Sequence, residues 1–134
     1  MKKTIRFLAV LILCISFVLV FASCTNDDSS PYNQVVKYDK GAMAEFIKNY
    51  NDSNMVCDGK ILIVLTDEAT AHIDEYTVDD FSQIAPISVK KIGKQILTVT
   101  IAEKDKESIL RAVYIVSLRS DVMSAEPNTY SEPF

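Results

Sequence analysis

The pattern of apolar and polar positions predicts a sheet built from four short strands. The continuous apolar run of residues 60–66 is typical of a strand that is buried on both faces or lies centrally in a sheet. Residues 87–91 and 95–102 alternate between apolar and polar side chains, and a turn centred on Gly93 joins them. Residues 121–125 complete the set as a last strand.

Apolar residues at three- and four-residue spacing predict helices before and between these strands. Residues 39–50 carry one short apolar stripe, and residues 104–120 form the strongest helix in the chain, with Asp105 as its N-cap. Residues 67–84 are expected to be helical in pieces, because acidic and threonine side chains suited to helix starts recur there. The polar residues 24–38 indicate a flexible tether.

The order strand, helix, strand, strand, helix, strand predicts an α+β domain. Two right-handed crossovers on one antiparallel sheet give a ferredoxin-like βαββαβ arrangement, in which the first strand lies inside the sheet and the helices cover one face. The other face is then open, and Leu62, Val64, Ile96 and Met123 are expected to form an exposed patch on it, which usually indicates a partner. Alternatively, the helix over 39–50 folds over this face within the same chain.

The N-terminus has the pattern of a secretory signal. Residues 1–6 carry three positive charges, residues 7–21 are apolar, and Ala22-Ser23 precede Cys24. This resembles a bacterial lipoprotein signal peptide, which implies that Cys24 receives a diacylglycerol group and becomes the mature N-terminus. The protein is then expected to be anchored by lipid on the extracytoplasmic face of the cell membrane. The alternative is an uncleaved anchor that spans the membrane.

These patterns divide the chain into five segments. They are a signal peptide over 1–23, a tether over 24–38, a short helix and linker over 39–58, the ferredoxin-like domain over 59–130 and a C-terminal tail over 131–134.

The charge balance excludes some classes of partner. Without Lys2, Lys3 and Arg6 the chain has 11 basic and 18 acidic side chains, a net charge of about −7. This argues against nucleic acid as a partner, since phosphate binding needs clustered positive charge. It also argues against electrostatic adhesion to anionic lipid, so membrane attachment depends on the acyl chains of Cys24.

No group of residues indicates catalysis, a metal or a cofactor. The adjacent acidic pairs 67–68, 74–75 and 79–80 diverge on a helix and suit helix starts better than a cation site. His72 is the only histidine, and it lacks a second ligand or a nucleophile nearby in the sequence. Cys57 is expected to be a half-buried thiol at a strand entrance, the alternative being a reactive thiol. We therefore expect a protein that is not an enzyme.

Four stretches of residues 60–130 resemble the prodomain-like modules of secreted subtilisin-type proteases, of the fervidolysin N-terminal prodomain kind. The stretches are Ile61-Leu62-Ile63-Val64-Leu65, Tyr76-Thr77-Val78-Asp79-Asp80-Phe81, Gln95-Ile96-Leu97-Thr98-Val99-Thr100 and Leu118-Arg119-Ser120-Asp121-Val122-Met123-Ser124-Ala125-Glu126-Pro127-Asn128. The resemblance implies a sheet face that lies on two helices of the enzyme and a tail that occupies its substrate cleft. Since no protease follows residue 134 in this sequence, the enzyme is expected to be a separate chain.

Together these patterns predict a protein-binding domain that uses the open sheet face and the C-terminal tail. The alternatives are an inhibitor or folding helper of a subtilisin-type protease, and a surface-structural lipoprotein with no specific partner. The candidate partner-binding residues are Leu62, Val64, Ile96, Thr98, Met123, Glu126, Pro127, Asn128, Tyr130 and Phe134.

Overall fold

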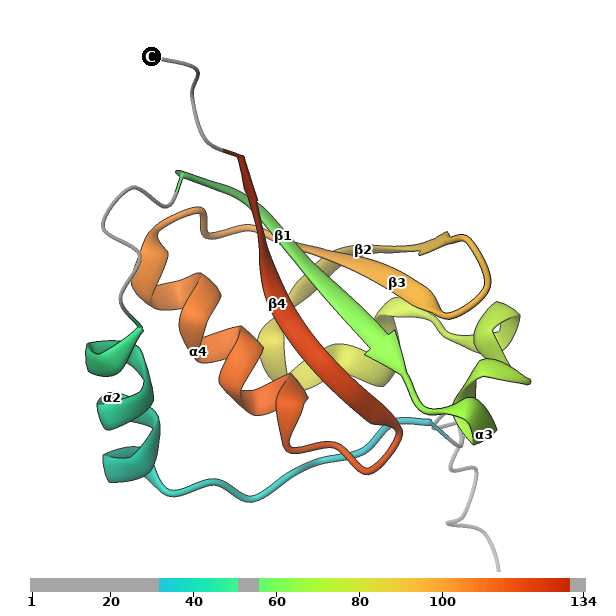
Figure 1. Ribbon diagram of the computed structural model, residues 1–134, viewed down its shortest axis with the longest axis horizontal. Helices are drawn as coiled ribbons and strands as arrows, with labels where there is room; N and C mark the ends of the chain where they lie inside the picture. Colours follow the sequence, from blue (N-terminus) through green and yellow to red (C-terminus); the bar gives the residue numbers. More distant parts are fainter. Residues whose placement is uncertain (1–31, 51–55, 131–134) are drawn as a thin grey trace, which may run out of the picture.

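The computed structural model describes residues 32–50 and 56–130, which form one sheet with helices packed against it (Figure 1). The predicted signal peptide, Cys24 and the tail over 131–134 lie outside the described residues. The elements are α2 (Lys40–Asn49), β1 (Val56–Leu65), α3 (Asp67–Thr70), the 3-10 helices η1 (Ile73–Glu75) and η2 (Val78–Ile84), β2 (Pro86–Ile92), β3 (Ile96–Ile101), α4 (Lys106–Ser117) and β4 (Val122–Tyr130).

The four strands form one antiparallel sheet in the order β2-β3-β1-β4. β1 is an interior strand that pairs with β3 on one side and β4 on the other. Its residues Ile61, Ile63 and Leu65 are fully buried and form the centre of the core. An α+β domain with a four-stranded antiparallel sheet and an interior first strand is therefore confirmed.

Helix α4 covers one face of the sheet by packing against β1 and β4. The carboxylate of Asp105 caps its start by accepting a hydrogen bond from the backbone N–H of Ser108, at 2.9 Å. Its buried side includes Ile109, Val113 and Val116, which join the core above β1. The predicted helix and its N-cap are both present, and the helix is a few residues shorter at each end than predicted.

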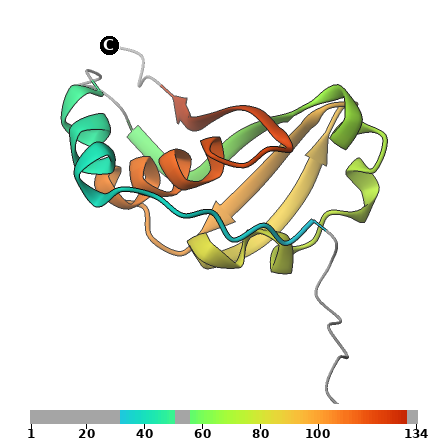
Figure 2. The same cartoon turned by 90° about the horizontal axis from the view of Figure 1, so that it is seen from below.

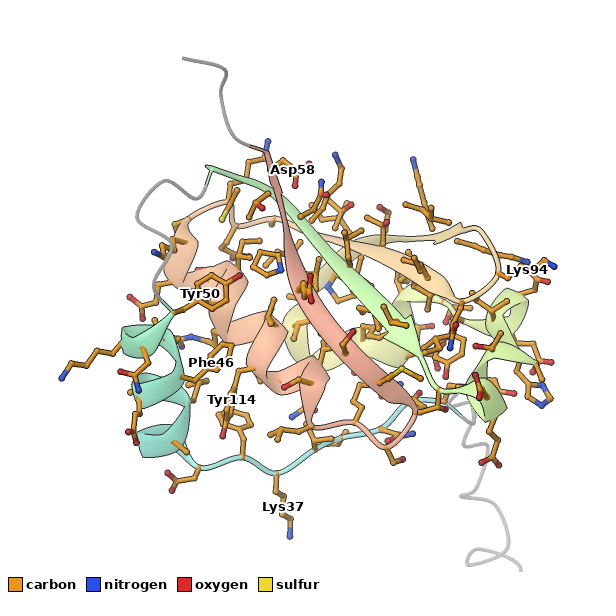
Figure 3. The ribbon with its side chains drawn as sticks, in the orientation of Figure 1. Lys37, Phe46, Tyr50, Asp58, Lys94 and Tyr114 are labelled. Carbon is orange, nitrogen blue, oxygen red and sulfur yellow. The ribbon has the colours of Figure 1, made fainter. Side chains whose placement is uncertain are left out.

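Helix α2 packs on α4 and not on the open face of the sheet. Asp39 caps it through a 2.7 Å bond from the backbone N–H of Ala42, and the ring of Phe46 lies 5.4 Å from that of Tyr114 in α4. Figure 3 shows these two rings facing each other between the helices. The alternative in which the helix over 39–50 folds over the open face is therefore not the one seen, and this helix leaves the open face uncovered.

The segment between β1 and β2 consists of short pieces, as predicted. Thr66 caps the single turn of α3 by accepting a hydrogen bond from the backbone N–H of Ala69. Thr77 and Asp80 form a capping box at the start of η2, where the Asp80 carboxylate accepts from the Thr77 backbone N–H at 2.7 Å. These caps explain why threonine and acidic residues recur over 66–80.

β1 and β4 extend several residues beyond their predicted bounds. β4 continues to Tyr130 instead of ending at Ala125, because β1 begins at Val56, which pairs with Tyr130. The extra length of β1 contains a register shift between Cys57 and Ile61. Gly59 lies in this shift with φ +81°, a backbone conformation that favours glycine.

Residues 32–38, which we call the strap, are held against the domain. The side-chain amide of Gln83 accepts a hydrogen bond from the backbone N–H of Val36 and donates one to its carbonyl, both at 2.8 Å. Arg119 Nη2 donates to the carbonyl of Tyr32 at 2.7 Å. Figure 2 shows the strap running along the helical side of the domain. The described part of the predicted tether, residues 32–38, thus makes hydrogen bonds to the domain.

Candidate interaction surface

Four of the candidate partner-binding residues lie side by side on the two inner strands. Leu62 of β1 is opposite Thr98 of β3, and Val64 is opposite Ile96. Because side chains alternate along a strand, all four point away from the face on which the fully buried residues of β1 lie. Leu62, Val64 and Ile96 are half-buried.

The pairing extends these residues into two rows across the sheet. The apolar row consists of Ile92, Ile96, Val64 and Ser124, and the mixed row of Lys90, Thr98, Leu62 and Glu126. Ile92 is 51% exposed and ends the apolar row on the β2 edge. Lys90 and Glu126 place opposite charges at the two ends of the mixed row. The open face therefore has an apolar strip beside a strip with charged ends.

The described helices lie on the other side of the sheet. α4 packs against β1 and β4, η2 packs against β2 and α4, and α2 packs against α4. Figure 2 shows α4 and η2 on the same side of the strands. Within residues 32–50 and 56–130, the open face is therefore available to another molecule.

Thr98 is the most buried residue of the two rows. It is 7% exposed, and its Oγ1 has no hydrogen-bond partner among the described residues. A buried hydroxyl without a partner costs about 1–3 kcal/mol. This polar atom lies between Lys90 and Leu62 in the centre of the mixed row.

The β4 residues of the candidate set divide between the two faces. Met123 is 61% exposed, but it lies at the register shift of β4, and Ser124 instead of Met123 is opposite Val64. Glu126 lies opposite Leu62 in the mixed row. Pro127 lies opposite Ile61 and is buried. The interpretation of Pro127 as a partner-binding residue is therefore corrected, because its side chain belongs to the core face.

The remaining candidates lie at the far end of β4. Asn128 donates a 3.0 Å hydrogen bond to the carboxylate of Asp58, which also pairs with Lys60 at 2.7 Å. Tyr130 is the last residue of β4 and belongs to the sheet rather than to a free tail. Phe134 lies outside the described residues.

Sequence reasoning did not find a buried ion pair at the start of β4. Arg119 donates from Nε and Nη2 to the two carboxylate oxygens of Asp121, at 2.9 and 2.7 Å. Its Nη1 donates to the carbonyl of Asp80, and its guanidinium lies 4.6 Å from the centre of the Phe81 ring. Tyr76 donates to Asp121 at 2.7 Å. Burial, and then the hydrogen bond to the Asp121 carboxylate, raise the pKa of Tyr76.

A second polar group lies beside this pair, where the strap meets η1. Glu75 interacts with His72 Nδ1 at 3.0 Å and accepts from the Tyr32 hydroxyl at 2.8 Å. These hydrogen bonds lower the pKa of the Glu75 carboxyl. The rings of Tyr32 and Tyr76 stack with centroids 4.8 Å apart. The stacking places the first described residue of the strap against the core.

This region contains an open pocket of about 320 Å³. Its lining residues are Tyr32, Gln34, Thr66, Glu68, Ala69, His72, Tyr76, Ser120 and Asp121. Two acids of the region already have partners, Asp121 with Arg119 and Tyr76, and Glu75 with His72 and Tyr32. Within the described residues no group of three or more His, Cys, Asp or Glu could hold a metal ion.

The comparisons with known proteins give no relative. No family model matches this chain, and neither a curated protein nor a solved structure is similar to it. Among the residues that the structure describes, no helix has the length and apolar character needed to cross a membrane.

Proposed function

We propose that this chain is a lipid-anchored, extracytoplasmic, non-catalytic domain that binds a protein through its open sheet face. The observation that carries the proposal is the pair of rows on that face. They offer the half-buried apolar side chains of Leu62, Val64 and Ile96 on the two inner strands. An uncovered apolar strip of this kind is typical of an interaction site.

We propose a ferredoxin-like topology for the domain. The strand order β2-β3-β1-β4, with α4 between β3 and β4 and short helices between β1 and β2, supports it. In the prodomain-like modules that this chain resembles, the same face of such a sheet lies on two helices of the enzyme. We therefore propose a helical surface of a secreted protein as the occupant of the two rows.

The signal-like residues 1–23 and Cys24 support the proposed anchor. If Cys24 is the lipidated residue, Cys24→Ser releases the protein from membranes into the soluble fraction. Ser23→Thr, which keeps the cysteine, serves as a control for changes beside the cleavage site. Retention of an uncut Cys24→Ser chain in the membrane would support a spanning anchor instead.

The more specific alternative is an inhibitor or folding helper of a subtilisin-type protease. It is favoured by β4, an edge strand that continues as far as Tyr130 and leads directly into residues 131–134. Edge strands and extended tails can add backbone hydrogen bonds along a substrate-binding strand of an enzyme. On this proposal the tail follows the strand into the substrate cleft.

Titration against a secreted subtilisin-type protease tests the face and the tail separately. We expect inhibition with a constant below about 10 μM, equivalent to roughly −7 kcal/mol of binding free energy. Val64→Arg weakens it by placing a charge in the apolar row, and deletion of 131–134 weakens it without unfolding the domain. Lys48→Glu, on the exposed side of α2, leaves it unchanged.

If the protease is not inhibited, a photo-crosslinker at position 62 in the membrane-anchored protein tests the general proposal. We expect a crosslinked product from position 62 that is absent from position 48 and is suppressed by Val64→Arg. Equal or absent crosslinking at both positions contradicts binding through the open face and favours a structural role with no specific partner.

A further inference from the structure

The strap enters the domain at one particular end of the sheet. At this end, which we call the anchor end, lie α3, η1 and the turn between β2 and β3. The Tyr32 hydroxyl donates to Glu75 of η1, and the neighbouring Asp74 pairs with Lys91 of β2 at 2.6 Å. Figure 1 shows the start of the strap beside α3, with η1 and the β2–β3 turn at the same end of the molecule.

Several hydrogen bonds along the strap hold it in one position on the domain. Arg119 donates a hydrogen bond to the carbonyl of Tyr32. Gln34 accepts hydrogen bonds from the backbone N–H and the hydroxyl of Ser120. The side-chain amide of Gln83 bonds to both the N–H and the carbonyl of Val36. A segment fixed at three alternate residues has a fixed direction relative to the sheet.

The chain between Cys24 and the strap is short. Tyr32 follows Cys24 by eight residues, which span at most about 28 Å when fully extended. Whatever their conformation, these residues keep Tyr32 and the anchor end within that distance of a lipidated Cys24.

The C-terminal end of β4 lies at the opposite end of the domain. β4 starts at Val122, directly after Arg119 and Asp121, and runs nine residues to Tyr130, a length of roughly 26 Å at the usual rise of a strand. In both views the chain leaves β4 at the end of the molecule away from α3 and η1 (Figures 1 and 2). The start of the strap and the C-terminal end of β4 are thus separated by about the length of the sheet.

Charge does not draw the anchor end into an anionic membrane. The anchor end exposes four acidic side chains on α3 and η1, Asp67, Glu68, Asp74 and Glu75, against the two lysines Lys91 and Lys94 at the β2–β3 turn, so its net charge is negative. These acidic side chains disfavour direct contact with anionic headgroups over the distance of about 8 Å at which salt screens charge. Orientation therefore has to come from the strap and not from adhesion of the surface.

We propose that strap docking attaches the domain to the membrane by its anchor end, so that the anchor end lies on average nearer to the lipid than the C-terminal end of β4. The inference rests on the proposed lipid anchor at Cys24 and specifies the partner of the open face. The mixed row then lies on average farther from the bilayer than the apolar row, because it is two residues farther from the anchor end along β1 and β3. The matching partner is a soluble secreted protein rather than one embedded in the bilayer.

Paramagnetic broadening in nuclear magnetic resonance spectra tests the orientation without depending on lipidation in the cell. The chain over 24–134 with Cys57→Ser is coupled through the Cys24 thiol to a maleimide lipid in phosphatidylcholine nanodiscs that contain a gadolinium-chelating lipid. We expect amide signals of residues 67–75 and 92–94 to be broadened at least several-fold more than those of residues 126–130. Uniform broadening, or the reverse gradient, overturns the proposed orientation.

Variants of the strap show whether the gradient of broadening depends on strap docking or only on the length of the tether. Gln34→Ala with Gln83→Ala removes four strap hydrogen bonds, and we expect the gradient of broadening to flatten. Lys37→Ala is the matched control, since Figure 3 shows Lys37 pointing away from the domain, and it keeps the gradient. An unchanged gradient in the double variant overturns the role of the strap. Failure of the lipid anchor itself is a separate result, seen as membrane retention of Cys24→Ser in cells.

Discussion

Arg119 and Asp121 form a buried ion pair joined by two hydrogen bonds, with side chains that are 3% and 10% exposed. The pair lies between α4 and β4, and Arg119 also binds the carbonyls of Asp80 and Tyr32. One side chain therefore connects the strap, η2 and the start of an edge strand. This position makes it the most informative target for tests of stability.

Arg119→Met is expected to lower the free energy of unfolding by about 3–5 kcal/mol, because it leaves Asp121 as a buried charge with its main partner removed. Urea denaturation followed by circular dichroism measures the change. Arg111→Met is the control, since its pair with Glu107 is exposed and is worth only about 0.3–0.5 kcal/mol. Adding Asp121→Leu to Arg119→Met should recover part of the loss. Equal effects at positions 119 and 111 would show that the buried pair has no special role.

Stability is expected to fall above pH 10 because of Tyr76. Its pKa is 10.0 when unperturbed, and burial and the Asp121 carboxylate raise it in the folded state. Above pH 10 the unfolded chain releases the phenol proton while the folded chain keeps it. The contribution of Tyr76 is thus complete below pH 10 and is lost at about 1.4 kcal/mol per pH unit until the folded pKa is reached.

The pH dependence is measured from unfolding free energies between pH 8 and 11.5. Tyr76→Phe is less stable at pH 8, since Asp121 loses a hydrogen bond, and its curve falls less steeply above pH 10. Lysines and other tyrosines contribute equally to both curves. If the two slopes coincide, the phenol is not held neutral by its surroundings.

Gln83→Ala is expected to release the middle of the strap. The variant loses two hydrogen bonds to Val36, at about 0.5–1.5 kcal/mol each, and the backbone N–H of Val36 loses its partner. Hydrogen exchange at Val36 should accelerate while exchange in β1 stays slow. Lys37→Ala should leave both rates unchanged. Rapid exchange at Val36 in the unsubstituted protein would mean that the strap is not docked in solution.

Thr98→Val is expected to stabilise the free domain. It replaces a buried hydroxyl that lacks a partner by a methyl group, which removes an unfavourable term of about 1–3 kcal/mol. Thr100→Val, at a half-buried position of the same strand, should change stability by no more than about 0.5 kcal/mol. A loss of stability would show that Thr98 has a partner in the free protein.

Much of the sheet could be predicted because its signals are local. The apolar run that contains Ile61 and Ile63 predicts an interior strand, and the two-residue period places Leu62 and Val64 on the opposite face. The stripe along α4 and its Asp105 cap are likewise contained within a dozen residues. The two rows of the open face follow from these local signals and the strand order.

The strap and the ion pair could not be predicted in the same way. The bonds between Gln83 and Val36 join residues 47 positions apart, and polar side chains in a linker have the same composition whether or not they are docked. Pro127 is a partner-binding candidate in the sequence because the last strand is predicted to end at Ala125, which leaves Pro127 outside the sheet; β4 instead continues and places Pro127 opposite the core residue Ile61. Long-range polar contacts leave no periodic trace in the sequence.

The bond between Arg119 and the carbonyl of Tyr32 spans 87 positions and has a consequence for the order of folding. A chain synthesised from its N-terminus presents Tyr32 long before Arg119 exists, so the strap at first has nothing to bind. Closing so long a loop is slow and must await the formation of α4 and β4. The residues nearest to the start of the domain are therefore the last to be fixed, and their protection from proteolysis reports that folding is complete.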